Sequence, residues 1–96
     1  MSVLLEQKIL AQMSNAQEVS RIWEMGLRSE VFEEPLNQAV FNFIIDYWQT
    51  NEMRLAPTRD VLVYEFPGVH IAEEVEESTI WLVEALQRRF ATNKLQ

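Results

Sequence analysis

The sequence predicts an all-α domain, a compact orthogonal bundle of about five helices. Apolar residues recur at spacings of three and four along the chain, and no stretch alternates as a half-buried strand would. Glycine and proline are rare, with 2 and 3 residues, and they stand at the ends of the periodic stretches. Hydrophobic residues make up 48% of the 96 residues, which is enough for the core of a single domain.

Residues 35–51 are predicted to form the central helix of this bundle. One apolar stripe lies at helical spacing on Leu36, Val40, Phe43, Ile44 and Tyr47, and a second on Phe41, Ile45 and Trp48. Because a helix that is apolar over most of its circumference must be covered by other elements, we expect the rest of the chain to pack around it. Pro35 suits its first position, and Asp46 is expected on its polar side.

Two helices are predicted before this central helix. The first is capped by Ser2 and runs to about Met13. The second runs to about Met25, where Gly26 provides a left-handed residue and Leu27 the apolar contact that accompanies it. Residues 29–32 are expected to form a short helical turn that directs Phe32 inward.

Two further helices are predicted after the central one. Thr58 is a typical N-cap for a helix through Phe66, which the pair at 67–68 ends. A longer C-terminal helix is predicted over about 71–93, with glutamates in its first half and basic residues at its end, as the helix dipole favours. The whole chain, 1–96, is therefore expected to be a single domain, with a head over 2–66 followed by this helix.

Charge and composition exclude several classes of function. The chain has 15 acidic and 8 basic residues, a net charge of −7, so its surface should repel phosphate backbones. It has no cysteine, which excludes disulfides, thiolate zinc sites and iron–sulfur clusters. No apolar run is long enough for a membrane span, and the N-terminus lacks the features of a signal peptide. We therefore expect a soluble cytoplasmic protein with no membrane partner.

The sequence carries no catalytic, cofactor-binding or metal-binding motif that we would assign. Phosphate-binding loops need several glycines, and Gly26 and Gly68 stand far apart. His70 is the only histidine, and it follows a turn with no nucleophile positioned beside it. Four glutamates at 73, 74, 76 and 77 could attract a divalent cation, but a solvated first helical turn is the favoured interpretation. No enzymatic activity is predicted.

The C-terminal segment carries more apolar surface than one bundle face uses. One stripe, predicted to face the core, comprises Ile71, Val75, Leu82, Leu86 and Phe90. Beyond it lie Ile80, Trp81, Val83 and Ala85. Either this helix is buried on two sides within its own domain, or part of its surface contacts another chain. The residues alone leave both interpretations open.

The order of these patterns resembles the N-terminal domain of DnaB-type replicative DNA helicases, bacterial or phage. Four successive features over residues 4–66 carry the resemblance, namely Glu6 with Ile9 and Leu10, the turn Glu30-Val31-Phe32, the helix Ala39-Val40-Phe41 with Ile44 and Ile45, and the cap Pro57-Thr58 with Val61-Leu62. The segment from Trp81 to Arg89 is similar to the second arm of the family's helical hairpin. The first arm is shortened or absent, and the motor domain with its Walker loop is missing.

The resemblance implies a non-catalytic module that acts through protein–protein contacts. Such domains associate into a collar above the helicase motor and receive primase or loader proteins, and they do not read DNA sequence. Carried over to this chain, self-association would use Trp81, Ala85, Arg88 and Arg89. The alternatives are a stand-alone adaptor that binds and regulates a helicase, and a small DNA-binding regulator. The last would have to use the helix 58–66, in which Arg59 is outnumbered by two acidic residues.

Overall fold

The chain folds as the predicted helical bundle. The computed structural model describes residues 3–94, which form five α-helices, a short 3-10 helix and no strand. The elements are α1 (Leu4–Gln12), α2 (Ala16–Glu24), η1 (Ser29–Val31), α3 (Pro35–Thr50), α4 (Arg59–Glu65) and α5 (Thr79–Lys94). The all-α fold class is thus confirmed. The predicted cap Ser2 lies outside the described residues.

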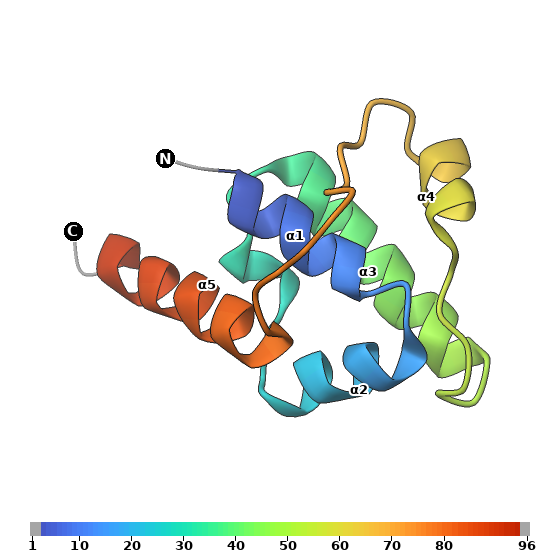
Figure 1. Ribbon diagram of the computed structural model, residues 1–96, viewed down its shortest axis with the longest axis horizontal. Helices are drawn as coiled ribbons and strands as arrows, with labels where there is room; N and C mark the ends of the chain where they lie inside the picture. Colours follow the sequence, from blue (N-terminus) through green and yellow to red (C-terminus); the bar gives the residue numbers. More distant parts are fainter. Residues whose placement is uncertain (1–2, 95–96) are drawn as a thin grey trace.

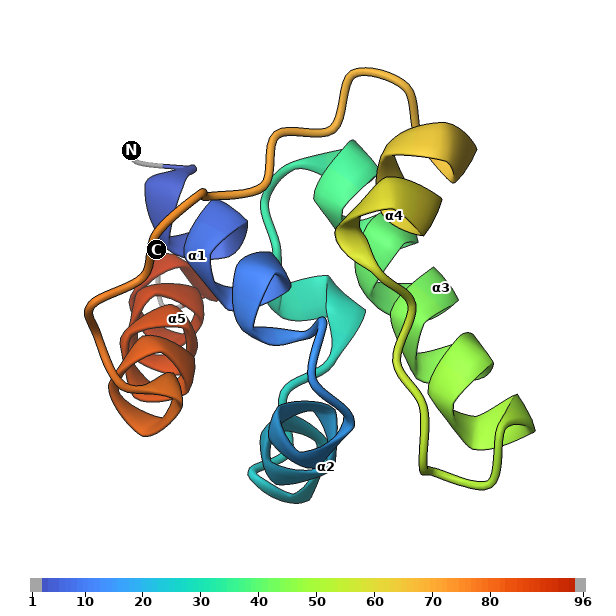
Figure 2. The same cartoon turned by 45° about the vertical axis from the view of Figure 1, so that its right-hand side comes forward.

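Helix α1 lies between α5 on one side and α3 on the other, as both ribbon views show (Figures 1 and 2). Helix α2 crosses one end of this arrangement, and α4 packs beside α3 at the far side from α5. Residues 67–78 form an irregular segment, here called the strap, that runs from α4 back across α1 to the start of α5. The first and the last helix of the described chain, α1 and α5, are therefore neighbours.

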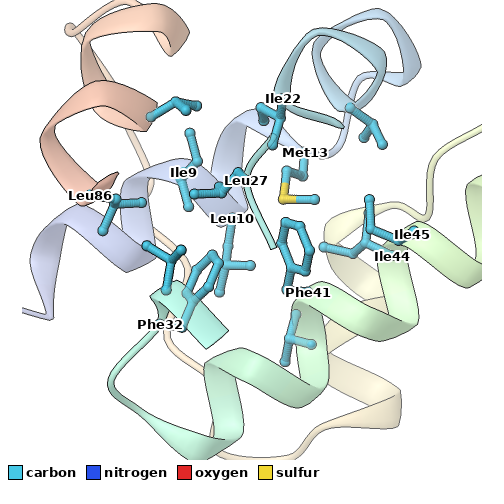
Figure 3. Close-up of a cluster of buried hydrophobic side chains, with 14 of the residues drawn as sticks. Ile9, Leu10, Met13, Ile22, Leu27, Phe32, Phe41, Ile44, Ile45 and Leu86 are labelled. Atoms are coloured by element: carbon cyan, nitrogen blue, oxygen red, sulfur yellow. The ribbon is translucent and has the colours of Figure 1, made fainter. Parts of the chain in front are cut away.

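The core is apolar and draws on every helix. Helix α3 contributes six buried side chains, more than any other helix of the described chain, in agreement with its two apolar stripes. Phe41 packs against Phe32 with ring centroids 5.2 Å apart, so the turn at η1 does direct Phe32 inward. Figure 3 shows these rings with Leu10, Ile44 and Leu86, which come from α1, α3 and α5. Asp46 is exposed on the polar side of α3, as predicted.

The predicted helix ends are confirmed by their hydrogen bonds. Gly26 has φ +88°, and the N–H groups of Gly26 and Leu27 donate to the carbonyls of Trp23 and Ile22, which completes the Schellman arrangement. Leu27 is fully buried. At α4, the Thr58 hydroxyl accepts from the N–H of Val61 at 3.3 Å. These local signals set the points at which the chain changes direction.

The predicted start of the last helix was wrong. Helix α5 begins at Thr79 rather than near residue 71, and with 16 residues it equals α3 in length. Ser78 caps it, since its hydroxyl accepts from the N–H of Trp81 at 3.1 Å. The glutamates at 73–77 therefore lie in the strap and not on a helical turn, so the helix dipole does not explain them.

Polar contacts hold the strap to the domain in its middle and near its C-terminal end. The Arg59 guanidinium donates to the carbonyls of Ile71 and Ala72 at 2.9 and 2.6 Å, and the Ala72 N–H donates to the carbonyl of Gln7 at 3.2 Å. Near α5, Lys8 Nζ lies 2.7 Å from Glu77 Oε2. Ile71 and Val75 pack against the core, as predicted for the apolar stripe of the C-terminal segment. They belong to the strap, however, and not to a helix.

We expect Gly26→Ala to lower the free energy of unfolding by about 1–2 kcal/mol, because a Cβ is disfavoured at positive φ. The space at Gly26 is open, with nothing within 4 Å of the added Cβ, so the loss would come from backbone strain alone. Urea denaturation followed by circular dichroism measures it. The control Gln17→Ala, on the exposed start of α2, should stay within about 0.5 kcal/mol of the parent. If both variants had the same free energy of unfolding, the positive φ of Gly26 would not be a source of strain for alanine.

The Lys8 ammonium, by its hydrogen bond to the Glu77 carboxylate, holds the pKa of Glu77 below its ordinary value. A depressed carboxyl pKa in the folded state means that this pair adds stability above the unfolded pKa and loses it as the pH falls through the folded one. We expect Lys8→Met to raise the pKa of Glu77 toward 4.5, measured by an NMR titration of its side chain. An unchanged pKa would show that Lys8 is not the cause.

Candidate interaction surface

Helix α5 is buried along one side and open along the other. Leu82, Val83 and Leu86 are fully buried, and they face the core beneath α1 and α2. The opposite side of α5 carries Ile80, Trp81, Glu84, Arg88 and Ala91, which are all exposed. Figures 1 and 2 show α5 at the edge of the bundle, with α1 beside it. We call these five residues the α5 outer face.

The four residues that the resemblance pointed to are divided between the two sides of α5. Trp81 is 45% exposed and Arg88 is exposed, so both lie on the α5 outer face. Ala85 is buried against the domain, and the Arg89 side chain is only 11% exposed. A contact with a neighbouring chain is therefore open to Trp81 and Arg88, whereas Ala85 and Arg89 have a structural role.

Arg89 reaches inward to a fully buried carboxylate, that of Glu6 on α1. The Arg89 guanidinium donates to Glu6 Oε2. The same carboxylate accepts from the N–H groups of Glu33 and Glu34 at 2.7 and 3.4 Å, and from the Asn37 amide at 2.9 Å. Because those two N–H groups precede α3, Glu6 also neutralises the positive end of that helix. One carboxylate thus joins α1, the start of α3 and α5.

Contacts with Glu33 and Val31 also orient Arg89. Its Nε lies 3.6 Å from Glu33 Oε2, and its guanidinium also donates to the carbonyl of Val31 at 3.4 Å. Glu33 in turn accepts from the amide of Asn93, one turn further along α5, at 2.7 Å. The basic end of α5 is therefore bound to the turn before α3, which sets the rotation of α5 about its own axis.

This role of Glu6 was not predicted from the sequence. The signal was present, because Glu6, Ile9, Leu10 and Met13 follow the helical spacing of a single buried face, and a glutamate on such a face requires a partner. Nothing in the sequence says which of the chain's basic residues is that partner. Only the antiparallel neighbour relation of α1 and α5 brings Arg89 to it.

The other residues that could carry a function, His70 and Arg59, have surroundings that do not indicate a reactive site. His70 lines an open depression of about 260 Å³ with Asn37, whose amide is bound to Glu6. Arg59, the basic residue of α4, is occupied by two carbonyls of the strap. In the described chain no three His, Asp or Glu side chains are grouped to hold a metal ion, and no helix there has the length and apolarity to cross a membrane.

Other exposed apolar side chains lie outside α5, namely Val63 and Tyr64 on α4, and Met53 and Leu55 on the connection that leads to it. Glu52 and Met53 have positive φ values, 60° and 62°, where the chain turns back after α3. Helices α4 and α5 lie on opposite sides of the domain, so Val63 and Tyr64 are separate from the α5 outer face (Figure 2).

Comparison with known proteins gave no relative. No protein-family model matches the chain, and no curated protein or solved structure shows significant similarity to it.

We expect Glu6→Gln to lower the free energy of unfolding by about 3 kcal/mol, because it leaves the Arg89 guanidinium without its buried counter-charge. Urea denaturation measures this loss. Glu30→Gln, an exposed glutamate in η1, makes the same chemical change outside the buried cluster and should shift stability by less than about 0.5 kcal/mol. A loss for Glu6→Gln no larger than that of Glu30→Gln would show that the buried pair does not stabilise the fold.

Proposed function

We propose that this chain is a non-catalytic interaction domain of a replicative DNA helicase, which contributes to the collar above the motor and contacts a primase or loader. The observation that carries the proposal is the α5 outer face, where Trp81 and Ile80 are each 45% exposed beside Arg88. Tryptophan and arginine are the residues most enriched among those that dominate binding energy at interfaces. Half-exposed tryptophan on a rigid helix is a surface suited to a partner chain.

The location of this face agrees with the resemblance of α5 to the second arm of the helicase hairpin. In place of a first helical arm, the chain here has the strap, which lies on α1 and leaves the outer side of α5 uncovered. The resemblance over residues 4–66 supplies the assignment to a helicase, and the α5 outer face supplies a surface for the contact.

The arrangement of charge supports protein contact over nucleic-acid contact. The net charge is −7, and Arg59, the arginine that the DNA-binding alternative would use, is bound to two carbonyls of the strap. Arg88 remains on the surface with Glu84 one turn before it. A face of mixed charge around an indole ring recognises a protein surface more readily than a phosphate backbone.

The test is light scattering of the domain, alone and mixed with a replicative helicase motor domain or a primase. We expect a complex with one of these partners, and we expect Trp81→Glu to weaken that complex about tenfold or more with no change in helicity. Tyr64→Glu is the matched control, since Tyr64 is an exposed aromatic residue on α4, at the opposite side of the domain.

Two results would contradict the proposal. One is the absence of a complex with either partner at concentrations well above the micromolar range. The other is an equal loss of binding for Trp81→Glu and Tyr64→Glu, which would mean that the α5 outer face has no special role.

A further inference from the structure

Residues 52–78, here called the cover, contribute little to the buried core of the domain. The cover comprises the turn after α3, helix α4 and the strap. Among the described residues, Pro57 and Leu62 are its only buried members, and Leu62 alone belongs to the buried apolar cluster. Other apolar residues of the cover, Phe66 and Ile71 among them, are only partly buried against that cluster. Because buried apolar surface supplies most of the stability of a folded segment, the cover is weakly held.

The helices α1, α2, α3 and α5 have a core of their own. Figure 3 shows part of it, with Leu10 from α1, Phe41 from α3 and Leu86 from α5. The polar cluster at Glu6 joins α1, α5 and the start of α3 without any residue of the cover. These helices therefore keep their apolar core, apart from Leu62, and their buried ion pair when the cover is removed.

The strap is fastened to α1 by contacts near the surface. The Ala72 N–H donates to the carbonyl of Gln7 at 3.2 Å, and the Gln12 amide donates to the carbonyl of Glu77 at 3.5 Å. The ion pair between Lys8 and Glu77 joins side chains that are 20% and 33% exposed. An ion pair that is open to water contributes little to stability, so water can replace these contacts at low cost.

Arg59 joins the two halves of the cover to each other. Its guanidinium reaches from α4 to the carbonyls of Ile71 and Ala72 in the strap, at 2.9 and 2.6 Å. A helix of 7 residues, the length of α4, is not stable on its own in water. Each half of the cover therefore depends on the other, as in a segment that unfolds as one cooperative unit.

The cover begins at a strained turn. Glu52 and Met53 have φ values of 60° and 62°, in the left-handed region that a residue with a Cβ disfavours. The closed position of the cover maintains this strain, and opening releases it. At its other end the cover meets the cap of α5 at Ser78. Opening can therefore begin at the turn and stop at α5.

The cover lies over an apolar side of α3, and Figure 2 shows α4 beside that helix. Phe66 packs edge-on against Phe43 of α3, with ring centroids 5.4 Å apart. Nearer the start of α3, Leu36 lines a depression together with Gly68 and His70 of the strap. Opening of the cover would therefore expose Leu36 and Phe43 on the central helix.

We propose that the cover opens as one unit while α1, α2, α3 and α5 remain folded, so that this side of α3 becomes accessible without unfolding of the domain. A ligand of that side would bind more weakly in proportion to the fraction of molecules that are open. The cover thus limits access to α3. No partner chain takes part in the opening, which is therefore independent of the helicase proposal.

Hydrogen exchange of single amides, followed by NMR at several low urea concentrations, measures this opening. The N–H groups of Leu62 and Phe66 in α4 and of Ala72 in the strap should exchange with one common free energy and one common urea dependence. Both quantities should be smaller than those for the N–H groups of Ile44 in α3 and Leu86 in α5, which exchange only through global unfolding.

Two substitutions that each remove one methylene from a fully buried side chain distinguish local from global opening. Leu62→Val weakens the closed state relative to the open and unfolded states alike, so the amides of the cover and of the core should both exchange about fivefold faster. Ile22→Val, in α2, weakens the core that the closed and open states share. It should accelerate the amides of Ile44 and Leu86 about fivefold and leave those of Phe66 and Ala72 unchanged.

Arg59→Met tests the connection between the two halves of the cover. Without the guanidinium, the Ala72 amide should exchange faster than the amides of Leu62 and Phe66, and their common free energy should be lost.

Either of two results would overturn the opening of the cover. One is exchange of the α4 and strap amides only through global unfolding, and the other is their equal acceleration with the core amides by Ile22→Val. Different free energies for α4 and the strap in the parent chain, or a common value that survives Arg59→Met, would overturn their coupling through Arg59.

Discussion

The buried carboxylate of Glu6 is the constraint on which the arrangement of the helices depends. A charge that is removed from water must be paired and hydrogen-bonded, and the carboxylate has four donors from three parts of the chain. Those donors are the two N–H groups before α3, the Asn37 amide and the Arg89 guanidinium. Burial of apolar surface has no preferred direction, whereas the hydrogen bonds of this cluster require a defined geometry between α1, α5 and the start of α3.

The orientation of α5 in turn determines what the domain presents to a partner. With Arg89 held inward, Leu82 and Leu86 point into the core, and Trp81 and Arg88 necessarily point away from it. A helix whose buried side is fixed by a charge pair has an equally fixed outer side. The surface proposed for protein contact is therefore a consequence of the internal ion pair, although none of the residues that make that pair belongs to it.

Much of the fold could be predicted from the sequence because its signals are local. Gly26, Pro35 and Thr58 mark helix ends through the conformations and caps available to their own backbone, and the structure confirms each. The start of α5 was predicted wrongly because Ile71 and Val75 continue the spacing of the stripe that follows. That spacing does not distinguish a helix from a strap laid on the core, and the cap at Ser78 was the better signal.

The sequence by itself determined the fold class, most helix ends and the membership of the core, because periodicity and capping act over a few residues. It also indicated that the C-terminal segment carries surplus apolar surface, but it did not predict the role of Glu6. Only the tertiary structure decided that Arg89 is the partner of Glu6 and that Ala85 is buried while Trp81 is exposed. Both features depend on which helices become neighbours. The contact of Arg89 with Glu6 joins residues more than eighty positions apart, and no local sequence pattern encodes it.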